Sequence, residues 1–126
     1  MYKVLPAGVK SSITRSISKV YESYMADIEW NEDRYDLSDF LKAWKDYIET
    51  NATWYEKVPV EVKENPLFHE EVALKINQTI EKILSEPPTE EQIIRIEAKQ
   101  EAMKTNIDYA CRAEAQFVET KLASLN

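Results

Sequence analysis

Apolar residues recur at helical spacing along most of this chain, and the pattern breaks at a few polar or proline-containing stretches. After an irregular lead-in at residues 1–10, the pattern predicts helices at residues 11–29, 37–57, 66–85 and 89–125. We therefore predict an all-α fold: a four-helix antiparallel bundle with a long C-terminal helix, forming a single domain over residues 1–126.

The first two predicted helices each have one apolar face. The lead-in should pack through Tyr2, Val4 and Leu5, and Ser11 or Ser12 should cap the first helix. Its face steps by one, three or four residues through Ile13, Ile17, Val20, Tyr21, Tyr24 and Ile28. The second helix follows Asp36, carries Leu37, Phe40, Leu41, Trp44, Ile48, Tyr55 and Val58 on its apolar face, and is expected to end at Pro59.

The third helix has the clearest boundaries. Asn65 is a good N-cap and Pro66 suits the first helical position, whereas Pro87 and Pro88 force the chain out of the helix at its end. Its core face is Val72, Ile76, Ile80 and Ile83. Residues 59–65, before this helix, fit either a single helical turn or an extended connector.

The predicted last helix begins with a capping box, Thr89 and Gln92, and contains neither Gly nor Pro. Its first apolar face is Ile93, Ile96, Met103, Ile107 and Ala110, but Glu114 and Lys121 fall on the same face further along. The apolar positions move to Cys111, Ala115, Val118, Leu122 and Leu125. We therefore expect the second half to bury a rotated face against the N-terminal lead-in, against another loop, or against a second copy of the chain in a homodimer.

Composition narrows the functional classes. The chain has 23 acidic against 16 basic residues and a net charge of -7, so nucleic-acid and anionic-membrane partners are not expected. One cysteine, Cys111, fits a reducing compartment and a core position. With no apolar run of the roughly 18 residues that a membrane span needs, the simplest location is the cytoplasm.

Tests for catalytic and metal motifs are mostly negative. A single glycine rules out the glycine-rich phosphate loops, and a single histidine, His69, rules out the paired Glu-x-x-His motifs of di-iron bundles. His69-Glu70-Glu71 lacks the second histidine of a zincin helix. Neither Glu70-Glu71 nor Glu90-Glu91 completes the carboxylate pattern of helical nucleotide pyrophosphohydrolases. We expect no catalytic residue, metal or cofactor.

The first functional hypothesis is a small acidic, non-enzymatic helical protein that regulates, inhibits or assists another protein by binding to it, or that self-associates. The residues expected to carry such contacts are Trp30 and Tyr35 in the acidic loop, Trp54 on the flank of the second helix, and Glu114, Val118, Lys121, Leu122 and Leu125. It predicts an exposed apolar strip along Val118, Leu122 and Leu125.

The alternative is a small-molecule-binding or enzymatic helical bundle. Its pocket would lie between the second helix and the C-terminal helix, where Tyr24, Trp44, Asn51 and Gln100 would supply converging polar groups. A glutamate near the middle of a helical face, Glu114, could in this case be a buried functional carboxylate, although exposure is the simpler expectation.

Overall fold

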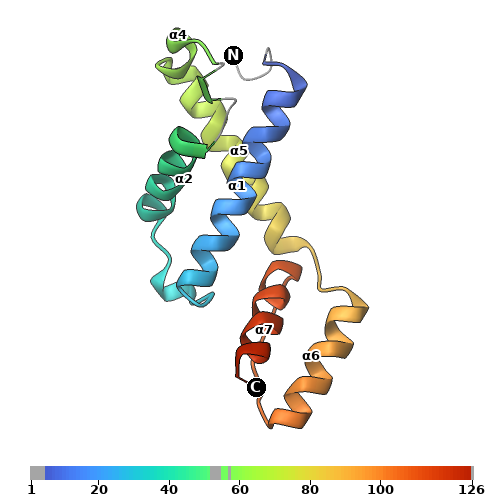
Figure 1. The fold of residues 1–126 in the computed structure, drawn as a ribbon. Helices are drawn as coiled ribbons and strands as arrows, with labels where there is room; N and C mark the ends of the chain where they lie inside the picture. Colours follow the sequence, from blue (N-terminus) through green and yellow to red (C-terminus); the bar gives the residue numbers. More distant parts are fainter. Residues whose placement is uncertain (1–4, 52–54, 57, 126) are drawn as a thin grey trace. The chain divides into compact units, whose positions relative to one another are not determined.

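The protein is all-α in a computed structural model that describes residues 5–51, 55–56 and 58–125, so this part of the fold prediction is confirmed (Figure 1). The chain divides into two compact units, Met1–Ile80 and Glu81–Asn126. The predicted four-helix arrangement is not confirmed, and the single domain stays a prediction.

The first helix, α1, spans Ala7–Asp27 and begins earlier than expected. The carbonyl of Pro6 accepts hydrogen bonds from the backbone N–H groups of Val9 and Lys10, at 3.0 and 3.1 Å. Pro6 thus occupies the N-cap position, and Ser11 and Ser12 lie inside the helix instead of capping it. The prediction of an irregular lead-in is therefore wrong from residue 7 onward. Tyr2 and Val4, which were expected to pack on the bundle, lie outside the described residues.

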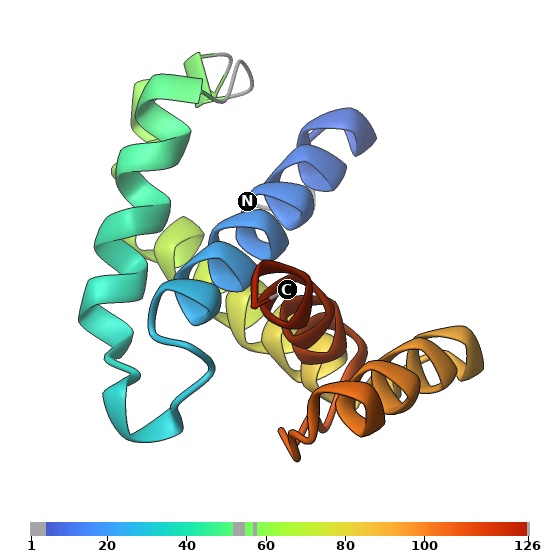
Figure 2. The ribbon, with the colours of Figure 1, turned by 60° about the horizontal axis from the view of Figure 1, so that its bottom comes forward.

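The chain reverses sharply after α1. Glu29 and Trp30 have backbone φ values of 57° and 54°. These lie in the left-handed region, which residues other than glycine rarely adopt. A short 3-10 helix, η2 (Glu32–Arg34), leads to α2 (Leu37–Asn51), and this corner is the cyan segment in Figure 2. The predicted apolar face of α1 is confirmed, because all of its members except the half-buried Tyr24 are buried.

The helices α1 and α2 run antiparallel and form the main contact of this unit. The hydroxyl group of Tyr24 accepts from the backbone N of Asp36 at 3.0 Å, and the indole Nε1 of Trp44 donates to Ser16 Oγ at 3.0 Å. Beyond Asn51, the predicted second helix continues into residues 52–54 and 57, which lie outside the described residues.

Two helices complete this part of the chain. Pro59 is the N-cap of α4 (Val60–Lys63), so residues 59–65 contain the single helical turn and not the extended connector. The next helix, α5 (Pro66–Ser85), has the predicted bounds. Asn65 caps it as expected, since its Oδ1 accepts from the backbone N of Leu67 at 2.8 Å. The boundary between the two units falls within α5.

The prediction of one long helix at residues 89–125 is wrong. Helix α6 spans Glu90–Met103 and ends at Lys104, which adopts a left-handed conformation with a φ of 56°. Residues 104–111, named here the return segment, have no regular structure beyond that cap. A separate helix, α7, then spans Arg112–Ser124. The capping box at the start of α6 is confirmed, with Gln92 N donating to Thr89 Oγ1 at 3.1 Å and Thr89 N to Gln92 Oε1 at 2.9 Å.

The return segment leads the chain back along α6, so that α6 and α7 run in the same general direction. Gln92 contacts Arg112 at the start of the two helices, and Arg95 pairs with Glu119 one to two turns further on. The core between them is Ile96, Ala115, Val118 and Leu122, each at most 1% exposed. The expected antiparallel order therefore does not apply to this pair.

Candidate functional site

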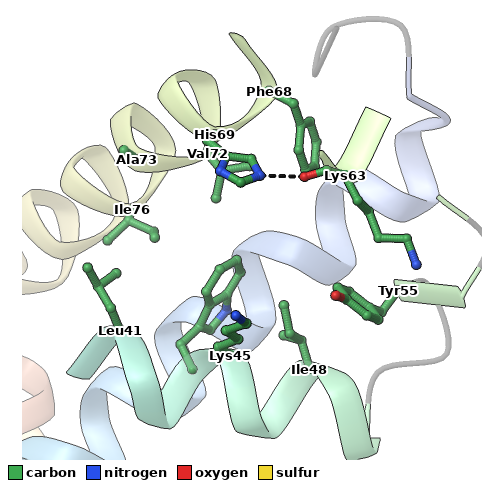
Figure 3. Close-up of a pocket in the computed structure, with 11 residues that line it drawn as sticks. Leu41, Lys45, Ile48, Tyr55, Lys63, Phe68, His69, Val72, Ala73 and Ile76 are labelled. Carbon is green, nitrogen blue, oxygen red and sulfur yellow. Dashed lines mark hydrogen bonds between the residues drawn. The ribbon is translucent and has the colours of Figure 1, made fainter. Parts of the chain in front are cut away.

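A cavity of about 360 Å³ lies between α2 and α5 in the unit Met1–Ile80. We call it the α2–α5 groove, and it is lined by Leu41, Trp44, Lys45, Ile48, Tyr55, Lys63, Phe68, His69, Val72, Ala73 and Ile76 (Figure 3). Figure 3 shows Leu41 and Ile76 facing each other at one end, with Tyr55, Lys63 and Phe68 gathered at the other. Since Leu41 is 38% exposed and Ala73 is exposed, the groove reaches the surface.

The α2 wall follows from the spacing of its residues. Leu41, Trp44, Lys45 and Ile48 follow one another at steps of three, one and three positions, which places them on one side of the helix. The Trp44 indole is held in place because its Nε1 donates to Ser16 Oγ at 3.0 Å. The Ser16 hydroxyl in turn donates to the carbonyl of Ile13 at 2.7 Å. This chain of hydrogen bonds presents the apolar ring of Trp44 to the groove with its polar atom already satisfied.

The α5 wall is built in the same way. Phe68, Val72 and Ile76 repeat every four residues and are 4–7% exposed. The sequence predicts Val72 and Ile76 as core residues, and their burial confirms it. His69 and Ala73 lie one position further on, at the exposed edge of the same face. The Asn65 cap fixes where α5 begins and therefore which residues face α2.

The end of the groove near α4 carries most of its polar groups. The Lys63 ammonium lies 4.1 Å from the centroid of the Tyr55 ring, a cation–π contact. His69 Nε2 donates a hydrogen bond to the backbone carbonyl of Lys63, as the dashed line in Figure 3 marks. Because a carbonyl oxygen only accepts, Nε2 carries the proton. Tyr55, Lys63 and His69 are thereby linked to one another.

The electrostatic character of the groove differs from that of the whole chain. The protein has 23 acidic residues and a net charge of -7, yet none of the eleven lining residues is Asp or Glu. Two lysines, Lys45 and Lys63, are among them. The lining is thus a locally basic and otherwise apolar surface on an acidic protein.

The aromatic residues predicted in the acidic loop pack within the first unit. The rings of Trp30 and Tyr35 each lie 6.3 Å from the ring of Tyr21, with edge-to-face geometry. Burial raises the pKa of Tyr35, and the neighbouring Tyr24 and Asp36 raise it further. Trp30 is half-buried and does not project as an exposed anchor. The third aromatic candidate, Trp54, lies outside the described residues.

The candidates in the C-terminal unit need correction. Val118 and Leu122 are 1% and 0% exposed, so the predicted exposed strip is wrong for both, while Leu125 is 55% exposed. The physical reason is that α7 is an independent helix whose apolar face packs on α6. The burial of Cys111 at the N-cap of α7 confirms its predicted core position.

Glu114 and Lys121 are half-buried residues of α7. Glu114 lies in the first turn, where its Oε1 accepts from the backbone N of Ala110 at 2.7 Å. A carboxylate in this position also interacts favourably with the helix dipole. Lys121 lies in the last turn, where a cation is favoured for the same reason. Their places are explained by α7 itself.

The four polar residues predicted to converge in a pocket form hydrogen bonds with other residues of their own units. Tyr24 forms a hydrogen bond with the backbone of Asp36, and Trp44 forms one with Ser16. Asn51 is exposed and donates to the carbonyl of Tyr47 at 3.3 Å. Both ends of the Gln100 side-chain amide are bound to the return segment. Of the four predicted pocket residues, Trp44 lines the α2–α5 groove. The second wall of the groove is α5 instead of the predicted C-terminal helix.

Sequence reasoning missed Lys45, Lys63, Phe68 and His69 as groove residues. The spacing of Phe68 with Val72 and Ile76 was an available signal, because it extends the predicted core face by one turn. The lysines gave no such signal, since their place beside a groove depends on how α2, α4 and α5 pack.

Comparison with protein-family models, curated proteins and solved structures finds no match for this chain. Among the described residues, no three His, Cys, Asp or Glu side chains are grouped so as to hold a metal ion. None of the described helices combines the length and apolar content needed to cross a bilayer. The function is therefore argued from the groove itself.

Proposed function

We propose that this protein is a non-enzymatic binding protein that holds a small apolar ligand in the α2–α5 groove. The observation that carries the proposal is the lining of the groove, in which aromatic and aliphatic side chains surround a cavity of about 360 Å³. Small-molecule sites commonly occupy about 300–1,000 Å³ and combine apolar walls with a few polar groups. The fixed Trp44 indole supplies a preformed apolar surface.

The chemistry of the lining favours binding over catalysis. The eleven residues include no Asp, Glu, Ser or Cys that would act as a nucleophile or carboxylate base. The imidazole of His69 is engaged through Nε2 with the carbonyl of Lys63. We further propose that the protein acts in the cytoplasm, because its one cysteine suits a reducing compartment.

A second candidate is the binding of another protein, as a regulator, inhibitor or accessory factor. It is favoured by Leu37 and Leu41 on α2, which are 50% and 38% exposed; Leu41 itself lines the groove. An apolar side chain of a partner would insert into the groove as an anchor. Self-association through α7 has lost its support, because Val118 and Leu122 are buried. Neither nucleic acid nor a membrane is proposed as a partner.

The test uses octanol as an uncharged probe and a variant that fills the groove. Ala73→Phe adds a ring at an exposed lining position, and Gln78→Phe adds the same ring at an exposed position of α5 outside the lining. We expect octanol to shift the NMR signal of the Trp44 indole N–H in the wild type and in Gln78→Phe. In Ala73→Phe the shift should be lost. Equal binding by both variants, or no binding to the wild type, would contradict a ligand site in the groove.

A further inference from the structure

We propose that the ligand of the α2–α5 groove is an amphiphilic anion, with an apolar body between α2 and α5 and a carboxylate headgroup held by Lys63, while Lys45 adds positive charge to the lining. This inference rests on the proposed function and adds the chemical class of the ligand. The ligand is a free small molecule.

The apolar body is assigned to the part of the groove farthest from α4. There Leu41 and Ile76 face each other, and Val72 continues the aliphatic wall towards His69 (Figure 3). These residues offer a ligand dispersion contacts and the removal of apolar surface from water, but no hydrogen bond. A ligand consisting of an alkyl chain or a ring satisfies this region.

The sign of the headgroup follows from the charges of the lining. On a protein with a net charge of -7, the long-range field repels an anion, so an anion site needs local positive charge. Among the described residues, the lining of the groove instead has two lysines and no acidic residue. An ammonium headgroup would find no carboxylate among these residues, whereas a carboxylate would find the ammonium of Lys63 and the added positive charge of Lys45.

The geometry of Lys63 makes it the principal contact for the headgroup. The Tyr55 ring holds its Nζ at 4.1 Å, which reduces the freedom that the side chain would lose on binding. Of the three N–H donors of an ammonium, those pointing away from the ring remain able to bind a carboxylate. Neither Lys63 nor Lys45 forms an ion pair with a described residue, since the pairs observed there are Arg95–Glu119 and Arg112–Glu86.

His69 supports Lys63 without contacting the headgroup through Nε2. Its Nε2–H is used by the carbonyl of Lys63, so the imidazole fixes the backbone of the residue whose ammonium binds the anion. It is a positioning residue in this arrangement. The three groups Tyr55, Lys63 and His69 thus form a preorganised end of the groove, which lowers the cost of ordering on binding.

The experiment compares three probes with the same chain and different headgroups: octanoate, octanol and octylammonium. Each is titrated into the full chain below its micelle-forming concentration, and binding is followed by calorimetry and by the Trp44 indole signal. We expect octanoate to bind most tightly and octylammonium most weakly. Equal or tighter binding of octylammonium would overturn the inference.

Lysine variants test the assigned contacts. Lys63→Gln should weaken octanoate binding about threefold to tenfold, as expected for a partly exposed charge-assisted hydrogen bond, and Lys45→Gln should weaken it by less; both variants should lower the affinity for octanoate relative to that for octanol. Lys42→Gln, at an exposed position of α2 outside the lining, is the matched control and should change neither. Far-UV circular dichroism checks that each variant is folded.

The results separate a failure of the inference about the anionic ligand from a failure of the proposed binding function. If octanol binds but octanoate binds no more tightly, or if the Lys63 and Lys45 variants match Lys42→Gln, the inference about the anion is wrong and the binding function stands. If octanol does not bind the wild type, the binding function of the groove is wrong as well.

Discussion

The side-chain amide of Gln100 is bound at both ends to the backbone of Ile107. Its Oε1 accepts from the Ile107 backbone N at 2.7 Å, and its Nε2 donates to the Ile107 carbonyl at 2.9 Å. Thr105 Oγ1 donates to the same Oε1 at 2.9 Å. Gln100 is 5% exposed. One buried glutamine therefore supplies both hydrogen bonds that a neighbouring strand would give to this residue of the return segment.

Replacing Gln100 with Ala should destabilise the C-terminal unit by about 2 kcal/mol. The substitution leaves the N–H and C=O groups of Ile107 without their partner, and each buried group left unsatisfied costs about 1–3 kcal/mol, with the lower end suited to part-buried groups. The measurement is hydrogen exchange resolved along the chain, in which amides of α6 and α7 should lose protection while those of α1 keep it.

Gln116→Ala is the control, because Gln116 is exposed on α7 and the substitution should change stability by less than about 0.5 kcal/mol. A second variant, Gln100→Glu, keeps an acceptor for the Ile107 N–H but loses the donor to its carbonyl. It should fall between the wild type and Gln100→Ala. If Gln100→Ala behaves like Gln116→Ala, the clamp does not hold the return segment.

The corrected position of α7 gives a second prediction. Leu122 is 0% exposed and Leu125 is 55% exposed on the same helix. Leu122→Ala should lower the free energy of unfolding by about 2–5 kcal/mol, the range for truncating a buried leucine, whereas Leu125→Ala should stay within about 0.5 kcal/mol. Urea denaturation followed by circular dichroism measures both. Small, equal losses combined with a change in oligomeric state would restore the exposed strip expected from the sequence.

Much of the helical pattern could be predicted from local sequence. The bounds of α5 follow from Asn65-Pro66 at its start and the two prolines after it, and the capping box of α6 follows from Thr89 and Gln92. These signals are local, because each depends on residues within one turn. The apolar face of α1 is equally local, since spacing determines which side chains share a helical face.

The break between α6 and α7 was not predicted because its usual markers are missing. A left-handed helix end normally has Gly or Asn, and here the residue is Lys104. Two signals were nevertheless present in the sequence. Thr105, Asn106 and Asp108 are poor helix formers, and the apolar positions after Ala110 are rotated with Glu114 on the old face. A new helix with its own phase explains that rotation.

The α2–α5 groove could be predicted only in part. Helical spacing places Leu41, Trp44 and Ile48 on one face and Val72 and Ile76 on another. Whether two such faces close on each other or leave a cavity depends on the distance between the helices, which no local pattern encodes. The contact between Lys63 and Tyr55 similarly depends on the turn α4, for which the sequence left two alternatives.

The capping box of α6 gives a third prediction. Thr89→Ala should reduce stability by about 1 kcal/mol, the usual cost of losing an N-cap side chain. The loss should extend to the start of α7, because the same Gln92 that completes the box donates to the Arg112 carbonyl at 3.3 Å. Hydrogen exchange at the first turns of α6 and α7 measures this. Thr120→Ala, at an exposed position of α7, should leave both unchanged.

The hydrogen bond between Tyr109 and Glu97 gives a prediction about pH. The hydroxyl of Tyr109 donates to Glu97 Oε1 at 2.6 Å, and this bond is the main cause that raises the pKa of Tyr109 from 10.0 to about 12, with burial and the charge of Glu97 adding to it. The folded chain thus keeps a proton that the unfolded chain loses. The stabilisation is fully present below pH 10 and disappears as the pH rises towards about 12.

Glu97→Gln tests the cause of this shift. Without the carboxylate, the pKa of Tyr109 should move back towards 10.0, because an amide oxygen is a weaker acceptor and carries no charge. The measurement is an NMR titration of ring-labelled tyrosine, with Tyr109→Phe identifying the signal. Glu101→Gln, an exposed glutamate one turn further along α6, is the control and should leave the titration of Tyr109 in place. If Tyr109 has the same pKa in Glu97→Gln and Glu101→Gln, Glu97 is not the partner that holds the phenol proton.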